Sequence, residues 1–229
     1  MIVFYSTEIS NQIAKLTGDE CMHCSKVLRK KKDDVVFVSN GKGNLYDGVI
    51  IDISKREVTI SLTSEIESQP ERHNRSIAIA PTKNIDRFEW FLEKSTEIGI
   101  SNIYPFLSSR SERKIIKPER LEKIIVSAMK QSKNLYKPTL HPLTPLAKLT
   151  QSDFGDQSKF IAHCKEPENA LQNLFTSGTN AIVLIGPEGD FTKEEVELAK
   201  TNNWQEISLG HSRLRTETAG IVACHLLNL

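Results

Sequence analysis

From residue 76 onward, short apolar runs alternate with amphipathic segments of helical period, and this alternation is the strongest constraint on the fold. The apolar runs have the length of strands, and the longest of them is AIVLI at residues 181–185. Strands that alternate with helices predict a parallel sheet covered on both faces. Ligands of such sheets bind beyond the carboxyl ends of the strands. The sequence therefore predicts an α/β domain with its site at one edge of the sheet.

The first seventy residues have a different pattern. Three runs rich in Val, Ile, Phe and Thr lie between residues 35 and 62, and a glycine turn at Gly41 and Gly43 separates the first two. Such runs, separated by turns, favour a small β-barrel or sheet. Residues 63–75 are polar and contain Pro70, which is typical of a linker. We therefore predict two domains, at residues 1–70 and 71–229.

Charge is unevenly distributed along a nearly neutral chain, whose formal net charge is +1. Basic side chains gather at residues 26–32 and again at 110–137. One such cluster is typical of a solvated helix face, but two of them favour binding to a polyanion such as nucleic acid. The scattered cysteines and the absence of a signal-like or membrane-length apolar run predict a cytoplasmic protein that binds no membrane.

Several common chemistries find no support in the sequence. The CMHC segment at residues 21–24 lacks the second ligand pair of a structural zinc site, so we expect free thiols and no metal. The glycine-rich segment at residues 40–48 joins two strands and lacks the following helix that a phosphate loop needs. The chain contains no G-x-x-x-x-G-K-[ST], HExxH or G-x-S-x-G motif.

The segment GPEGDF, residues 186–191, joins an apolar run to a helix-like segment. Its glycines permit close approach of another group to the backbone. Thr192 and Glu195 have the spacing of a capping box, which explains how the next helix begins. The capping box does not explain the longer Gly-Pro-Glu-Gly connection. Taken alone, this connection is as consistent with a turn as with a ligand site.

A second junction of the same kind follows at residues 208–220, SLGHSRLRTETAG. Thr216 or Thr218 could cap the helix that begins there, and Glu217 is expected to contact its free backbone N–H groups. Arg213 and Arg215 are not explained by capping, because cations at a helix N-terminus oppose the helix dipole. Their placement therefore hints at a function.

Together, LIGPEGDF and LGHSRLRTETA resemble the paired motifs of the bacterial 16S ribosomal RNA uridine-N3 methyltransferase family, which belongs to the knotted SPOUT superfamily. HCSKVLRKKKDD at residues 23–34 and KNIDRFEWFLEKSTEIGI at residues 83–100 are also similar to segments of this family. The resemblance implies a PUA-like β-barrel, then a parallel sheet with a C-terminal trefoil knot. It also implies a homodimer that binds S-adenosylmethionine and acts on 16S ribosomal RNA in the small subunit.

The resemblance also implies roles for individual residues, all of them expectations. Arg215 would stabilise charge on the uracil, and Glu188 would act as a base or orienting group. The expected cofactor-binding residues are Ile185, Gly186, Pro187, Glu188, Gly189, Leu209, Gly210, Leu214, Arg215, Thr216, Thr218 and Ala219. The expected RNA-binding residues are Arg29, Lys30, Lys83, Arg110, Arg113 and Lys133.

The chain departs from the family pattern at three places. Asp190 occupies a position that is usually glycine, and Ser212 occupies that of an arginine, with Arg213 one residue later. Asn134 stands where another arginine is usual, next to Lys133, which would keep a charge without the fork-shaped donor group. Two alternatives stay open: a related enzyme that methylates a ribose 2′-hydroxyl or another base, and an RNA-binding relative without catalysis.

Overall fold

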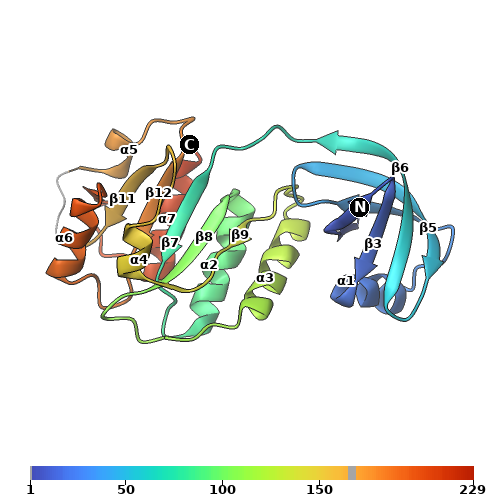
Figure 1. Cartoon of the computed structure of the whole chain (residues 1–229), viewed down its shortest axis with the longest axis horizontal. Helices are drawn as coiled ribbons and strands as arrows, with labels where there is room; N and C mark the ends of the chain where they lie inside the picture. The colour runs from blue at the N-terminus through green and yellow to red at the C-terminus, as the bar shows by residue number, and fades with distance from the viewer. Residues whose placement is uncertain (1, 165–168) are drawn as a thin grey trace. The chain divides into compact units, whose positions relative to one another are not determined.

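The structure of the protein, a computed structural model, describes residues 2–164 and 169–229. The chain forms two compact units, each of which is described by itself (Figure 1). The first comprises Met1–Glu71 together with Met129–Lys137, and the second comprises Arg72–Ala128 and Pro138–Leu229. The first unit is thus assembled from two separate stretches of the chain.

The first unit is built on a six-stranded sheet in the order β1-β4-β5-β6-β3-β2. All neighbouring strands are antiparallel except β1 and β4, and the apolar side chains of one face form a core around Phe4, Leu16 and Ile60. A small β-domain ahead of the α/β domain is therefore confirmed. Its strands are β1 (Val3–Tyr5), β2 (Glu8–Ser10), β3 (Ile13–Thr17), β4 (Val35–Ser39), β5 (Asn44–Ile53) and β6 (Glu57–Ser68).

The linker predicted at residues 63–75 begins too early, because β6 continues to Ser68. The last residues of β6 are all exposed, so they lack the alternation of buried and exposed side chains that would have identified a strand. Backbone pairing with β5 holds them in place as far as the pair Asn44 and Ser68. Register shifts along this pair show that the ladder is irregular.

The glycine turn between β4 and β5 packs closely against the second stretch of the first unit. The Gly43 N–H donates to the Leu135 carbonyl over 3.0 Å, and the Tyr136 hydroxyl donates to the Gln69 carbonyl over 3.0 Å. A Cβ atom on Gly43 would lie 2.5 Å from the Tyr136 hydroxyl oxygen. Glycine is therefore required here by close contact as well as by its φ of +98°.

Cys21 and Cys24 are buried thiols of the first unit, on α1 (Gly18–Met22) and the π-helical segment η1 (His23–Val27). Burial raises the pKa of Cys24 to about 11, with a further contribution from Cys21. The thiol therefore stays protonated near neutral pH, which disfavours both metal binding and redox exchange. Across residues 2–164 and 169–229, no group of three His, Cys, Asp or Glu side chains is placed to hold a metal ion.

The second unit is an α/β domain around a parallel sheet in the order β10-β8-β7-β12-β11-β13, with β9 beside β8 (Figure 1). All its strand pairs are parallel, which confirms the predicted sheet. The strands are β7 (Arg75–Ile79), β8 (Asn102–Leu107), β9 (Thr139–Leu140), β10 (Thr144–Pro145), β11 (Ser158–Ala162), β12 (Ala181–Ile185) and β13 (Gln205–Ile207).

Core side chains cover both faces of this sheet. Along β12, Val183 and Ile185 belong to one apolar cluster, whereas Ile182 and Leu184 belong to another. The five residues of β12 are all buried, as the continuous apolar run predicted. The covering helices are α2 (Ile85–Ile98), α3 (Pro118–Gln131), α4 (Leu146–Thr150), α5 (Leu171–Leu174), α6 (Lys193–Thr201) and α7 (Thr216–Leu227).

Helix α7 packs tightly against α2 and β7. A Cβ atom on Gly220 would lie 2.7 Å and 2.8 Å from two ring carbons of Phe91, and 3.0 Å from Ile79 Cδ1. The absence of a side chain at Gly220 thus lets the two helices approach each other. None of the helices that the structure describes is long and apolar enough to span a membrane.

Candidate functional site

Five chain segments gather at one edge of the parallel sheet, because each follows the carboxyl end of a strand. The segments that follow β12 and β13 carry the two motifs identified in the sequence. Strand β11 lies between β12 and β13, so its end lies between the two motif loops. The five segments are residues 80–83 after β7, 108–113 after β8, 163–164 after β11, 186–192 after β12 and 208–215 after β13.

The loop after β12 is a defined turn with several anchors. The N–H of Asp190 donates to the Pro187 carbonyl over 2.9 Å, and Glu188 Oε1 accepts from the Lys83 N–H over 2.9 Å. A Cβ atom on Gly186 would lie 3.0 Å from the Phe191 ring, so the ring covers this glycine closely. The predicted capping box of α6 is confirmed, with Thr192 and Glu195 binding each other's backbone N–H groups.

The predicted cap of α7 is wrong. The N-cap is Arg215, and among the described residues no side chain caps the first turn. Thr216 is the first residue of the helix, and its buried hydroxyl donates to the Gly186 carbonyl over 3.1 Å instead. This hydrogen bond joins the two motif loops directly. The N–H groups of the first turn of α7 thus have no capping side chain within residues 2–164 and 169–229.

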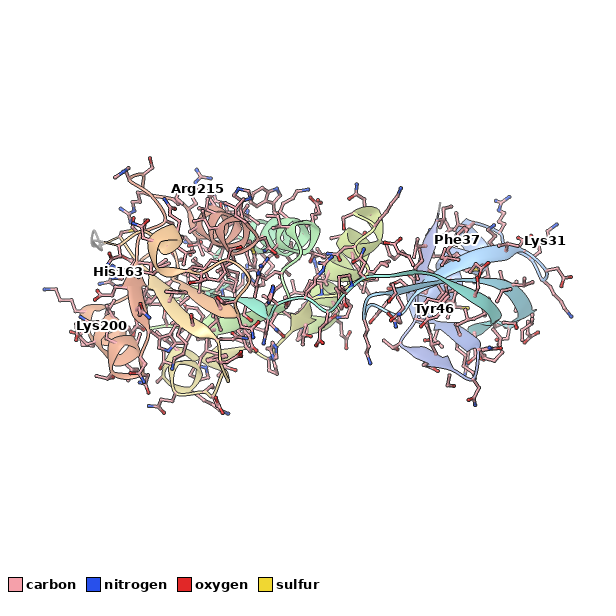
Figure 2. The ribbon with its side chains drawn as sticks, turned by 90° about the horizontal axis from the view of Figure 1, so that it is seen from above. Lys31, Phe37, Tyr46, His163, Lys200 and Arg215 are labelled. Atoms are coloured by element: carbon pink, nitrogen blue, oxygen red, sulfur yellow. The ribbon has the colours of Figure 1, made fainter. Side chains whose placement is uncertain are left out.

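Arg213 and Arg215 have exposed side chains. Arg215 lies where α7 begins and His163 lies just beyond the end of β11, and both are labelled in the second unit (Figure 2). Neither guanidinium forms a hydrogen bond or an ion pair with the part of the chain that the structure describes. Both arginines are thus available to a ligand with negative charge, which is consistent with their unfavourable position at a helix N-terminus.

Glu217 does not contact backbone N–H groups as expected. Its carboxylate is buried, and Oε1 lies 3.8 Å from the Nε atom of Arg87 on α2. The other oxygen, Oε2, has no hydrogen-bond partner within the described residues. The helix dipole favours a carboxylate in this first turn, and the Arg87 guanidinium lies within ion-pair distance of it.

The remaining expected cofactor-binding residues lie on the same two segments. Ile185 is buried at the end of β12, whereas Leu209 is half-buried and packs against the core. Gly210 has a φ of +126°, a conformation that favours glycine. Leu214, Thr218 and Ala219 are half-buried along the second motif and the first turn of α7.

The sequence interpretation missed the end of β11. The Cys164 N–H donates to Asp190 Oδ2 over 3.2 Å, which ties this strand end to the loop after β12. His163 Nε2 lies 2.9 Å from Glu206 Oε1 on β13, so it connects β11 to its other neighbour. The signal that could have located these residues is their position directly after the apolar run FIA at 160–162, where ligands of parallel sheets bind.

The Cys164 thiol responds to charges on both motif loops. Burial raises the pKa of Cys164, Asp190 raises it further, and Arg213 lowers it. The Asp190→Asn variant should therefore lower this pKa and speed alkylation of Cys164 by iodoacetamide near neutral pH, whereas Arg213→Ala should slow it. The rate of adduct formation, followed by mass spectrometry, measures both effects because the other cysteines are buried. Equal alkylation rates in the wild type, Asp190→Asn and Arg213→Ala would mean that the two loops do not meet at Cys164. The control variant is Asp153→Asn, which should react at the wild-type rate.

The loop after β8 holds two of the other loops in place. Arg110 donates to the Gly189 carbonyl over 2.7 Å, and Arg113 donates to the carbonyls of Thr82 over 3.0 Å and Lys83 over 2.6 Å. These two arginines, expected to bind RNA, thus have a defined role in shaping the site. Lys83 itself forms an exposed ion pair with Glu112, at 2.8 Å.

The other expected RNA-binding residues belong to the first unit. Arg29 and Lys133 are exposed and lie in left-handed backbone conformations, with φ values of 52° and 56°. Lys30 is half-buried, whereas the neighbouring Lys31 extends into solvent (Figure 2). Asn134, which stands in place of an arginine, is buried and accepts a hydrogen bond from the Tyr136 N–H over 3.1 Å. It therefore serves the local fold.

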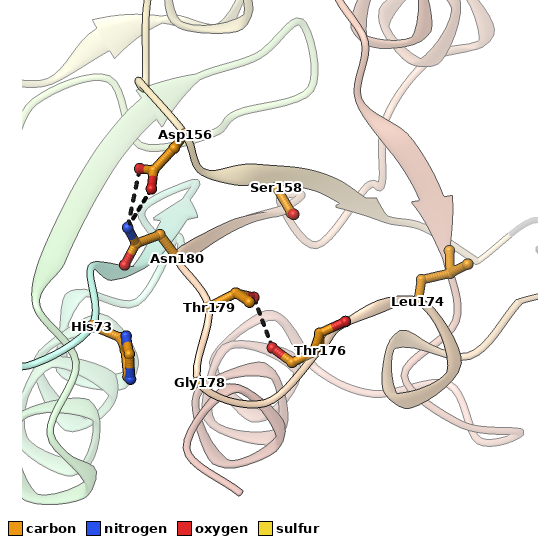
Figure 3. Close-up of a pocket in the computed structure, with 8 residues that line it drawn as sticks. All are labelled: His73, Asp156, Ser158, Leu174, Thr176, Gly178, Thr179 and Asn180. Atoms are coloured by element: carbon orange, nitrogen blue, oxygen red, sulfur yellow. Dashed lines mark hydrogen bonds between the residues drawn. The ribbon is translucent and has the colours of Figure 1, made fainter.

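A hollow of about 480 Å³ lies at the opposite edge of the sheet, where β11 and β12 begin (Figure 3). Its polar groups bind each other: Asp156 accepts from Asn180 with both oxygens, and Thr179 donates to the Thr176 carbonyl. These contacts explain the polar side chains of Asp156, Thr179 and Asn180 without a ligand. The motif loops lie at the other end of the strands, so this hollow is separate from the candidate site.

Comparisons with known proteins match both parts of the chain. Residues 69–228 match the family described as RNA methyltransferase domain, and residues 16–63 match the RNA methyltransferase PUA domain. Ribosomal RNA small subunit methyltransferase E of Rickettsia conorii is 30% identical over 217 residues, which cover 93% of this chain and 88% of that protein.

Two solved structures have similar folds over nearly the whole chain. A probable rRNA-methyltransferase from Porphyromonas gingivalis has 38% sequence identity and a TM-score of 0.87, covering 100% of this chain and 98% of its own. A putative methyltransferase from Legionella pneumophila, in complex with the bound cofactor SAM, has 26% identity and a TM-score of 0.86. It covers 99% of this chain and 96% of its own.

Proposed function

Because the chain belongs to the RNA methyltransferase family, we propose that it methylates N3 of a uridine in small-subunit ribosomal RNA, using S-adenosylmethionine. The observation that carries this proposal is the hydrogen bond from Thr216 to the Gly186 carbonyl, which joins the two motif loops at the carboxyl edge of the sheet. The family establishes an RNA methyltransferase. The small subunit is named by the relative from Rickettsia conorii, and N3 of uridine is the finer part of the proposal.

The edge of the sheet has groups that fit S-adenosylmethionine, which supplies the methyl group when bound. The first turn of α7 offers N–H groups that no side chain of the described part of the chain caps, and these suit the carboxylate of the methionine part. Gly189 is exposed, and its backbone can approach a ligand closely. The related Legionella pneumophila structure, which has the cofactor bound, supports the same ligand here.

Arg215 and Glu188 are the residues that we assign to the reaction. Uracil N3 carries a proton that must leave as the new bond forms, so a cation near a uracil oxygen lowers the barrier. Arg215 has no hydrogen bond or ion pair of its side chain among the described residues and is free to take that role. Glu188 is exposed, and one of its oxygens is held by the Lys83 N–H. The other oxygen can orient the base or accept its proton.

The RNA must present an unpaired uridine, because N3 lies on the edge that a base pair would cover. The exposed basic residues of the first unit, among them Arg29 and Lys133, are suited to phosphate groups. In the second unit, Arg110 and Arg113 would link RNA binding to the loops that they hold. We propose the cytoplasm as the compartment, because ribosomal RNA is the substrate.

The homodimer and the trefoil knot are parts of this proposal. Strand β13 lies at the edge of the sheet. From there the chain runs back to the centre of the sheet, where α7 packs against α2, β7 and β12. A knotted crossing of the last segment through the preceding loop is consistent with this path. A second copy of the chain would complete the surroundings of the site, which would lie near the subunit interface.

The decisive experiment is methyl transfer to small ribosomal subunits from a strain that lacks the corresponding gene. The modified nucleotide is then identified by mass spectrometry, and N3-methyluridine is the expected product. A methylated ribose or another base would show a related enzyme with a different target. Calorimetry with S-adenosylmethionine separates both outcomes from an RNA-binding relative without catalysis, for which no heat of cofactor binding would be measured.

A further inference from the structure

The backbone of Asp190 has a left-handed conformation, which is strained for most residues other than glycine. Its φ is +59°, in the left-handed region, which costs most residues about 1–2 kcal/mol. Glycine adopts this conformation without strain, and aspartate tolerates it better than most residues do. The presence of aspartate at this position therefore calls for a compensating interaction of its side chain.

Both carboxylate oxygens of Asp190 supply that interaction. Oδ1 accepts from the Phe191 N–H over 2.8 Å, and Oδ2 accepts from the Cys164 N–H over 3.2 Å. The hydrogen bond from Phe191 lies within the loop, whereas the hydrogen bond from Cys164 connects the loop to the end of β11. Cys164 lies past the end of the paired strand, so its N–H would otherwise need another acceptor.

We propose that Asp190 is a positioning residue that holds residues 186–191 in the shape that binds S-adenosylmethionine. Glycine at 190 would give the same turn with neither bond, and the loop would then be less ordered before the ligand binds. A loop ordered in advance loses less conformational entropy on binding and therefore binds more tightly. This inference rests on the proposed function, because it takes S-adenosylmethionine as the ligand of the loop.

The test compares Asp190→Gly with Asp190→Asn by calorimetry with S-adenosylmethionine. Asp190→Gly keeps the backbone conformation and removes both hydrogen bonds, so we expect about 10-fold weaker binding. Asparagine tolerates the same conformation and keeps one carbonyl oxygen as acceptor, so Asp190→Asn should recover part of the affinity. Methylation assays should show a larger change in KM for the cofactor than in kcat.

Two further measurements separate positioning from a general effect on stability. Amide hydrogen exchange at Cys164 should speed up in Asp190→Gly, because that N–H loses its acceptor. The matched control is Asp153→Gly, which removes a similar bond, from the Gly155 N–H to Asp153 Oδ1 at 2.8 Å, at the opposite edge of the sheet. This control should bind the cofactor like the wild type.

The possible outcomes are distinct. If the wild type does not bind S-adenosylmethionine, both the proposed function and the inference about Asp190 are overturned. If the wild type binds it and Asp190→Gly binds it equally well, only the role of Asp190 is overturned. A parallel fall in thermal stability, kcat and affinity in Asp190→Gly would assign Asp190 to the general fold and would also overturn positioning.

Discussion

Methyl transfer by an Arg215→Ala variant is expected to fall at least about 100-fold, because removing one charge-stabilising donor from an active site has effects of this size. Arg215 is the N-cap of α7, and within residues 2–164 and 169–229 its side chain is not used to hold the fold. The folded structure should therefore survive the substitution. Binding of S-adenosylmethionine, measured by calorimetry, should change much less than turnover.

Arg215→Lys is the matched control for this prediction. Lysine keeps the positive charge but lacks the planar fork of the guanidinium, so partial activity would show that charge alone supplies part of the effect. Full activity of Arg215→Ala would remove this residue from the mechanism and leave Glu188 as the candidate. Loss of cofactor binding in Arg215→Ala would instead assign Arg215 to the cofactor site.

A Gly220→Val variant is expected to lose about 3 kcal/mol of unfolding free energy, at the upper end of the range for overpacking a core. The new Cβ would lie 2.7 Å from a ring carbon of Phe91 and 3.0 Å from Ile79 Cδ1, and valine adds two methyl groups beyond it. Both neighbours are fully buried, so they have little room to move. Urea unfolding followed by circular dichroism measures the loss.

His225→Val controls for the helix propensity of valine, because His225 is exposed on the same helix. This variant should unfold close to the wild-type midpoint. Equal midpoints for Gly220→Val and the wild type would show that α7 does not pack on Phe91 as closely as the structure has it.

Periodicity predicted most elements of the second unit because their side chains alternate between core and solvent. Gly99 ends α2 in a left-handed conformation, and Pro118 begins α3. The end of β6 was missed because its exposed residues carry no periodic signal. The assignment of residues 129–137 to the first unit could not be predicted, since it depends on contacts such as that of Gly43 with Tyr136.

The two motif loops were identified from their composition, but the contacts that join them were not. Thr216 was expected to cap its own helix, yet its hydroxyl reaches the Gly186 carbonyl, which is distant in sequence. Asp190 departs from the family pattern, and its side chain accepts a hydrogen bond from the Cys164 N–H, which is also distant in sequence. Sequence spacing contains no information on such pairs, because the fold alone brings them together.

The division of the first unit into two stretches affects how the protein forms during translation. Residues 72–128 emerge from the ribosome before the stretch Met129–Lys137 that completes this unit. Until then, the glycine turn at Gly43 and the carbonyl of Gln69 lack the partners that Leu135 and Tyr136 provide. A nascent chain that ends at Glu71 would therefore lack the contacts that complete the first unit, and this unit can be completed only after Lys137 has been synthesised.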